Sequence, residues 1–227
     1  IDIRLIDFNH TQEKRVATIN STLISGAGAF NALTSLLPEM KKVLLVTDSN
    51  VGKLAATTAI HALLTANGKE VQVIDTVPAE PTQHDMAEIH HVASAWQPEL
   101  VVGIGGGSVL DVTKLLSVLL HPQSPGLDAL LNGEKPAHKI PSLLIPATAG
   151  TGSEATPNAI LAIPEQNTKV GIISPVLLPD YVALLPELTT SMPAHIAAST
   201  GIDALCHLLE CFTATVANPV SDNAALI

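Results

Sequence analysis

The stretch PELVVGIGGGSVLD, residues 98–111, predicts the fold of this chain because it joins a buried strand to a helix through three consecutive glycines. PELVVGIG has the continuous apolar run of a strand that is covered on both faces. Gly105, Gly106 and Gly107 let the backbone approach a pyrophosphate closely, and the start of the following helix adds partial positive charge. The loop departs from G-x-G-x-x-G, since Ser108 stands in place of the last glycine. A tight strand–helix turn without a ligand is the alternative that this stretch leaves open.

The same alternation of strand and helix extends in both directions from this stretch. Apolar runs predict strands over 41–48, 69–75, 98–105 and 140–148, and the intervening patterns predict helices over 51–66, 82–96 and 108–120. A β-ribbon is expected over 158–174 and a last short strand over 181–185. This order is typical of a doubly wound parallel sheet with helices on both faces. We therefore expect an α/β, Rossmann-like, dinucleotide-binding domain over residues 1–186.

From residue 187 onward the sequence predicts helices only. The segment ELTTSMPAHIAASTGIDALCHLLECFTA is rich in alanine, leucine and helix caps, and Asn218-Pro219 is a good start for a further helix. That helix is still apolar where the chain ends at Ile227. We therefore expect residues 187–227 to begin an all-α C-terminal domain that is truncated here, in a longer protein.

Composition restricts the partners and the compartment. A net charge of −10 argues against nucleic acid or an anionic membrane as a main partner. Because 47% of the residues are hydrophobic and 14% are charged, the chain can bury a sizeable core. Cys206 and Cys211 lie in one apolar segment and suggest no disulfide framework, which fits a reducing compartment. The N-terminus lacks the plan of a secretory signal, and the apolar runs are short and broken by proline, so we expect a cytoplasmic protein.

Two further features near predicted strand ends can contact a nucleotide. The loop ATAGTGSEAT, residues 147–156, follows a strand, and its hydroxyl groups at Thr148, Thr151 and Ser153 can donate to phosphate or ribose oxygens, although a plain turn is an equal alternative. Asp48 ends another strand at the edge where open α/β sheets bind ligands. Its carboxylate can accept from a ribose 2′-hydroxyl, or it can cap the helix that begins near Val51. The sequence leaves both alternatives open.

Asp203 and His207 form a candidate half of a metal site in GIDALCHLLECF, residues 201–212. Four residues apart on a helix, they share one face, and a carboxylate with an imidazole suits a divalent transition ion. Their neighbours Ile202, Leu205, Leu208 and Leu209 are apolar, so we expect a buried pair that needs compensation, with a simple salt bridge as the alternative. Two ligands are too few for a catalytic ion, so the others are expected beyond Ile227.

Other histidines are better explained without a metal. His84, Glu88 and His91 share one face of a predicted polar helix, and a solvated face is the preferred interpretation. His195, near a predicted helix start, is expected to be structural.

Taken together, these motifs resemble the iron-containing (group III) alcohol dehydrogenase family. GGGSVLD is similar to its cofactor loop, PATAGTGSE to its second glycine loop and GIDALCHLLECF to its metal helix, and LLPDYVALLPELTTSMP and ANPVSD follow in the family's order. The resemblance implies metal-dependent hydride transfer between NAD(P) and a small primary or secondary alcohol or aldehyde. It also implies NAD rather than NADP, Fe²⁺ with Zn²⁺ as the alternative, and a homodimer or higher homo-oligomer.

The resemblance assigns roles to individual residues. Asp203 and His207 match two metal ligands, and Asp48 matches the position that favours NAD. The remaining cofactor-binding positions that it implies are Gly105, Gly106, Gly107, Ser108, Asp111, Thr148, Thr151 and Lys169. The sequence also departs from the family at Glu80, where many members have asparagine, at Ala147, where threonine is frequent, and at Leu185, where aspartate is common. No proton acceptor for catalysis is visible in this chain.

Three rival functions fit parts of the pattern. A lyase resembling dehydroquinate synthase shares the architecture, but the GIDALCH helix and the GTGSE loop argue against it. A relative of glycerol dehydrogenase is a second alternative. The third is a nucleotide-binding module that keeps the fold without catalysing a reaction.

Overall fold

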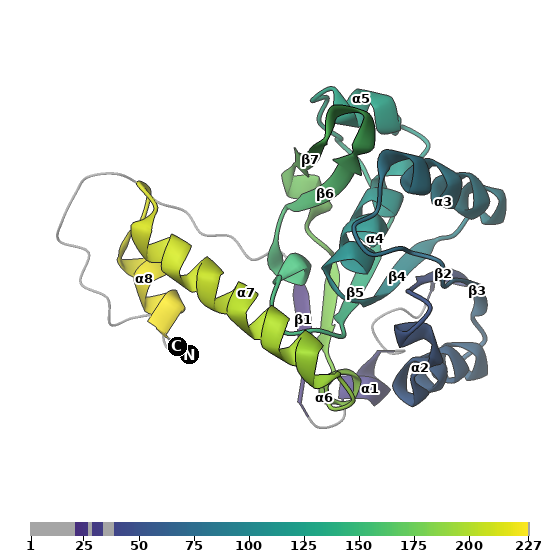
Figure 1. The fold of residues 1–227 in the computed structure, drawn as a ribbon. Helices are drawn as coiled ribbons and strands as arrows, with labels where there is room; N and C mark the ends of the chain where they lie inside the picture. Colours follow the sequence, from purple (N-terminus) through teal and green to yellow (C-terminus); the bar gives the residue numbers. More distant parts are fainter. Residues whose placement is uncertain (1–20, 27–28, 34–38, 227) are drawn as a thin grey trace.

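The computed structural model describes residues 21–26, 29–33 and 39–226, and their centre is a six-stranded parallel sheet (Figure 1). The strands lie in the order β1-β8-β5-β4-β2-β3, and every neighbouring pair is parallel. Their bounds are β1 Thr22–Ser25, β2 Lys42–Val46, β3 Glu70–Ile74, β4 Leu100–Gly105, β5 Ser142–Pro146 and β8 Tyr181–Leu184. The predicted parallel, Rossmann-like sheet is confirmed.

Helices connect the strands and cover the sheet. The α-helices are α1 Ala29–Ala32, α2 Ala55–Ala66, α3 Gln83–Trp96, α4 Gly107–Leu119, α5 Leu127–Leu131, α6 Pro186–Thr189, α7 Ala194–Thr213 and α8 Pro219–Leu226. Single 3₁₀ turns occur at η2 Val51–Lys53, η3 Ser153–Ala155, η4 Pro164–Gln166 and η5 Pro175–Leu177. The predicted ribbon is the antiparallel pair β6 Asn158–Ile163 and β7 Thr168–Ile173.

Successive side chains of the central strands point to opposite faces of the sheet, and each face is covered by a hydrophobic core. Val101 packs into a core with α3, α4 and the ribbon, whereas Val102 packs into a second core with α1, α2 and α6. Helix α4 is enclosed more than the others, and every residue from Val109 to Leu119 is buried. This enclosure fixes the glycine loop that precedes α4.

Two features near the start of the described chain differ from the prediction: an additional strand, β1, and a divided helix before β3. The strand β1 was not predicted; it lies at one edge of the sheet and pairs with β8. The helix expected over 51–66 is divided, because Leu54 is extended (ψ 142°) between η2 and α2. The interpretation of the first fifteen residues lies outside the described part of the chain.

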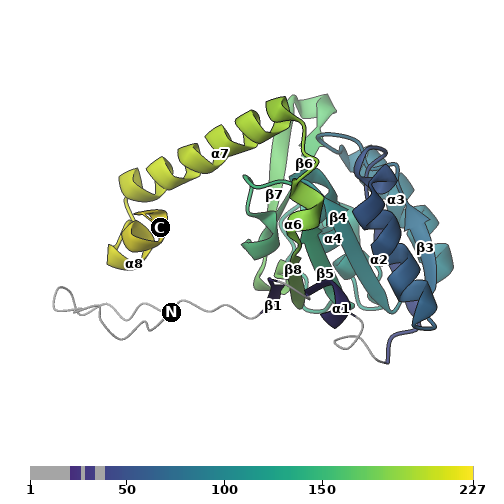
Figure 2. The ribbon, with the colours of Figure 1, turned by 90° about the horizontal axis from the view of Figure 1, so that it is seen from below.

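Helices α7 and α8 extend away from the sheet (Figures 1 and 2). The predicted start of α8 is confirmed, since Asn218 Oδ1 accepts hydrogen bonds from the amides of Val220 (3.0 Å) and Ser221 (3.3 Å). No helix in the described residues has the length and hydropathy that crossing a membrane would require.

Candidate functional site

The glycine loop after β4 is built for close approach of the backbone. A methyl group on Gly105 would stand 2.6 Å from the Val109 side chain, and one on Gly107 would stand 2.9 Å from that of Thr151. Gly106, the N-cap residue of α4, provides no side-chain cap, so the amides at the start of α4 have no capping oxygen. These amides lie at the carboxyl edge of the sheet, where a helix N-terminus suits an anion.

The second glycine loop, which follows β5, packs directly against the first. A methyl group on Gly106 would lie 3.5 Å from the Thr148 side chain, and Thr151 contacts Gly107. The Thr151 hydroxyl also accepts a hydrogen bond from the Ser153 amide at 3.3 Å. Two predicted cofactor loops, some forty residues apart in sequence, therefore pack against each other.

Lys114 holds this second loop in place, a role that the sequence analysis missed. Its side chain is fully buried in α4, and its ammonium donates to the carbonyl oxygen of Ser153 at 2.9 Å and to that of Asn158. Its charge is balanced by Asp111 Oδ1, also at 2.9 Å. Burial lowers the pKa of Lys114, and the Asp111 carboxylate opposes this shift. A lysine three residues after an aspartate in an otherwise apolar helix was the available signal.

Asp111 thus has both carboxylate oxygens within reach of protein groups. Oδ1 faces Lys114, and Oδ2 accepts a hydrogen bond from the Ile160 amide at 3.0 Å. The structure therefore places Asp111 as a link between α4 and β6, next to the loop for which a cofactor role was predicted.

Asp48 has the capping contacts that the sequence allowed. Its Oδ1 accepts hydrogen bonds from the amides of Asn50 (2.8 Å) and Val51 (3.0 Å). These amides lie at the start of η2, whose N-cap residue is Asn50, so Asp48 stabilises the 3₁₀ turn that precedes α2. The carboxylate remains at the carboxyl end of β2, so a ribose contact stays a prediction.

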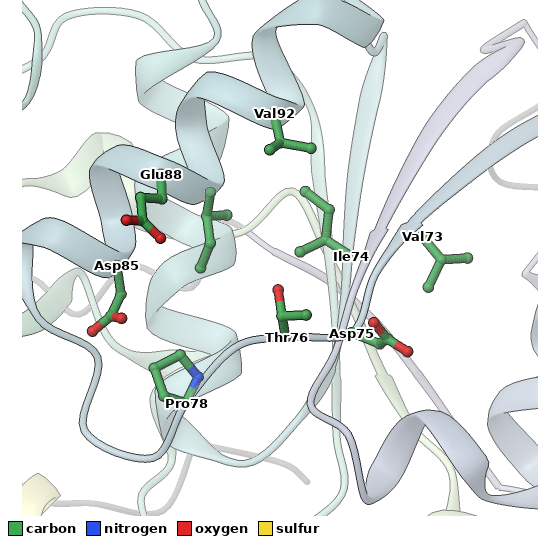
Figure 3. A pocket seen from close by; sticks show the side chains of 9 residues that line it. Val73, Ile74, Asp75, Thr76, Pro78, Asp85, Glu88 and Val92 are labelled. Atoms are coloured by element: carbon green, nitrogen blue, oxygen red, sulfur yellow. The ribbon is translucent and has the colours of Figure 1, made fainter.

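A cavity of about 400 Å³, which the sequence analysis did not predict, lies between the end of β3 and α3 (Figure 3). Val73, Ile74 and Val92 form apolar walls, and the carboxylates of Asp75 and Glu88 are among its lining groups. Such a lining repels phosphate and accepts hydrogen bonds from a ligand that carries donor groups.

The histidine face of α3 is solvated, as expected. His84, Glu88 and His91 are exposed, and His84 Nε2 lies 2.5 Å from Glu165 Oε1 across to the ribbon turn. The hydrogen bond that the His84 ring donates to the Glu165 carboxylate raises the pKa of His84. This contact is a surface ion pair, and it does not involve the glycine loops.

Lys169, the predicted cofactor lysine on β7, is paired with the unusual residue Glu80. Lys169 Nζ lies 2.8 Å from Glu80 Oε1. The amide of Glu80 in turn donates to Ser108 Oγ at 3.3 Å. The structure therefore brings Lys169, Glu80 and the first turn of α4 to one place.

Helix α7 carries the predicted half-site and touches the second loop. A methyl group on Gly150 would stand 2.6 Å from the Thr200 carbonyl oxygen, one helical turn before Asp203. His207 Nε2 lies 3.8 Å from Asp203 Oδ1, which confirms that the two side chains share a face. Within the described ranges, no group of three or more His, Cys, Asp or Glu side chains could hold a metal ion. Asp203 and His207 are therefore half a site at most.

The expected burial of this pair is wrong. No residue of α7 is buried, and the side chains of Asp203 and His207 are 44% and 51% exposed. The apolar neighbours Ile202, Leu205, Leu208 and Leu209 are exposed as well. Helix α7 projects from the sheet, and among the described elements only α8 packs extensively along it (Figure 2). His195, also exposed, lies in the first turn of α7.

A parallel α/β sheet with an uncapped glycine loop at its carboxyl edge defines the class of Rossmann-like, nucleotide-binding folds. Within that class, residues 20–186 match the family described as iron-containing alcohol dehydrogenase. The chain belongs to the iron-containing alcohol dehydrogenase family.

Individual relatives agree with this family. The chain is 33% identical to the sulfoacetaldehyde reductase of Bilophila wadsworthia, over 88% of this chain and 52% of that protein. It is 35% identical to long-chain-alcohol dehydrogenase 1 of Geobacillus thermodenitrificans, over 87% of this chain and 51% of that protein. The solved structure of an iron-containing alcohol dehydrogenase from Thermotoga maritima superposes with a TM-score of 0.83 at 31% identity, over 92% of this chain and 58% of that one. The chain spans about half the length of the curated relatives that it matches.

Proposed function

We propose that this protein is an NAD-dependent, iron-containing alcohol dehydrogenase that transfers hydride between a small alcohol or aldehyde and the nicotinamide. The observation that carries the proposal is the chain of close contacts from Gly107 to Thr151 and from Gly150 to Thr200. Through these contacts the uncapped loop, the hydroxyl-rich loop and the helix with Asp203 and His207 adjoin one another. A cofactor and a metal bound at these places would lie on neighbouring elements.

The cofactor fits the first turn of α4. The amides of Gly107 and Ser108 would hold the pyrophosphate, and the hydroxyl groups of Thr148 and Thr151 would donate to it or to a ribose. Asp48, at the end of β2, would accept from the adenosine ribose and repel a 2′-phosphate. NAD is therefore the proposed cofactor, in preference to NADP.

The metal fits the donor set of α7. The Asp203 carboxylate and the His207 imidazole would hold a divalent ion, for which Fe²⁺ is proposed and Zn²⁺ is the alternative. Held by Asp203 and His207, the ion would supply a positive charge for the alcohol oxygen, and a nicotinamide bound at the glycine loops would supply the hydride chemistry. We propose residues 1–186 as the nucleotide domain and 187–227 as part of the metal-binding domain.

The substrate class follows the family, and the particular substrate is left to experiment. One relative is named for sulfoacetaldehyde and another for long-chain alcohols, at similar identity. We propose a homo-oligomer, a dimer or larger, that acts in the cytoplasm on a small-molecule substrate. The net charge of −10 supports neither nucleic acid nor an anionic membrane as partner.

The test is NADH oxidation by the full-length protein, loaded with Fe²⁺ or Zn²⁺, against a panel of short, long and sulfonated aldehydes. Asp203→Asn and His207→Gln should lose both the bound metal and turnover. His91→Gln, at an exposed histidine of α3, is the matched control and should keep both. If no aldehyde is reduced, the proposal fails. Turnover of another substrate without net change in NADH would favour the lyase, and absence of bound metal would favour the binding module.

A further inference from the structure

Glu80 has a backbone that is fixed beside the proposed pyrophosphate site. Its amide donates to Ser108 Oγ at 3.3 Å, and the carbonyl of the next residue, Pro81, accepts from the Ala162 amide at 3.0 Å. Glu80 also adopts a left-handed backbone conformation, with φ 51°, which residues other than glycine and asparagine rarely adopt. The surrounding contacts therefore impose this position on the residue.

The side chain of Glu80 holds the lysine that faces the same place. Its carboxylate lies 2.8 Å from Lys169 Nζ, and the two side chains are 71% and 54% exposed. The hydrogen bond from Lys169 is the main reason that the pKa of Glu80 lies below its ordinary value, so the carboxylate is charged at neutral pH. An anion that approaches the first turn of α4 therefore meets an ammonium group whose charge is already paired with the Glu80 carboxylate.

An exposed ion pair of this kind is weak and opens readily. We propose that Glu80 sets the affinity for the dinucleotide by competing with its pyrophosphate for the ammonium group of Lys169. Glu80 is thus a positioning residue that acts through Lys169, and the proposal rests on the dinucleotide site proposed above.

The experiment measures the Kd of NADH for the full-length protein by fluorescence titration at low and high salt. Glu80→Gln keeps the length of the side chain, removes its charge and should tighten binding about two- to fivefold at low salt. The gain should shrink at high salt, because the released lysine acts through an exposed charge. Glu165→Gln breaks another exposed ion pair on the same ribbon and changes the net charge equally, so it should leave the Kd unchanged.

A double-mutant cycle separates the lysine from simple repulsion. In a Lys169→Met background, the gain from Glu80→Gln should disappear. An equal gain in that background, or no gain in the wild-type background, would overturn the inference while the dehydrogenase proposal stands. A wild-type protein that binds neither NADH nor NADPH would overturn both.

Discussion

Gly150 and Thr200 are in such close contact that a methyl group on Gly150 would stand 2.6 Å from the Thr200 carbonyl oxygen. This contact joins the second glycine loop to the helix that carries Asp203 and His207. Because the obstructing atom belongs to the backbone, no change of rotamer can relieve the overlap. The contact therefore requires glycine at this position.

Gly150→Ala should separate the loop from α7, destabilise the protein by about 1–3 kcal/mol and weaken metal retention. The measurements are urea unfolding and metal content after dialysis of the full-length protein. Gly201→Ala is the matched control, because a methyl group there meets no atom within 4 Å and alanine favours the helix by about 1 kcal/mol. Equal losses for the two variants would contradict the role assigned to this contact.

Lys114→Met should destabilise the protein by about 3–5 kcal/mol, because it leaves the buried Asp111 carboxylate without its counter-charge. The unfolding free energy from urea denaturation tests this. Adding Asp111→Asn should restore part of the loss, since no charge then stays buried and the asparagine oxygen can still accept from Ile160. A double variant that is less stable than Lys114→Met would refute this account.

Asp48→Asn should raise the efficiency with NADPH relative to NADH by about tenfold, because it removes a negative charge from the proposed ribose site. Asparagine keeps an oxygen for the amides of Asn50 and Val51, so η2 should remain intact. The ratio of kcat/KM for the two cofactors is the measurement. An unchanged ratio would exclude Asp48 from cofactor selection.

The His84–Glu165 pair should stabilise the protein only in a window of pH. The His84 pKa is raised above its ordinary 6.5, so its contribution is fully present below 6.5 and is lost as the pH rises through the folded value. The Glu165 pKa is lowered below its ordinary 4.5, so its contribution is fully present above 4.5 and is lost as the pH falls through the lower, folded value. His84→Gln should lower the thermal midpoint near about pH 5.5 and have no effect near about pH 9. His91→Gln should change neither, and a constant effect of His84→Gln would argue against the pair.

The sequence predicted those parts of the fold that depend on local patterns. Strands β2, β4 and β5 are continuous apolar runs between turn signals, and they lie where they were expected. The glycines after β4 predicted the loop, because only glycine permits such a close approach of the backbone. The Asp203 and His207 side chains share a face because four residues make about one helical turn.

What the sequence could not predict depends on contacts between distant segments. Lys114 is buried because Ser153 and Asn158 supply carbonyl oxygens from about forty residues away. Glu80 was noticed as a departure from the family, but its pairing with Lys169 spans 89 residues. The exposure of α7 contradicted the expectation from its apolar composition, since apolar residues become buried only where another element covers them.

Helix α7 contacts the second glycine loop at Thr200, so a tilt of the helix about this contact moves the residues further along it. His207 lies about 10 Å further along the axis, at 1.5 Å per residue. A tilt of about 5° at the Gly150 contact would therefore move the imidazole by about 1 Å, half the length of a metal–nitrogen bond. The second glycine loop makes this contact through Gly150, and the same short stretch of chain carries Thr148 and Thr151. A shift of that loop around a bound dinucleotide would therefore also move the proposed metal ligands, so binding of the proposed cofactor and of the proposed metal would affect each other without direct contact.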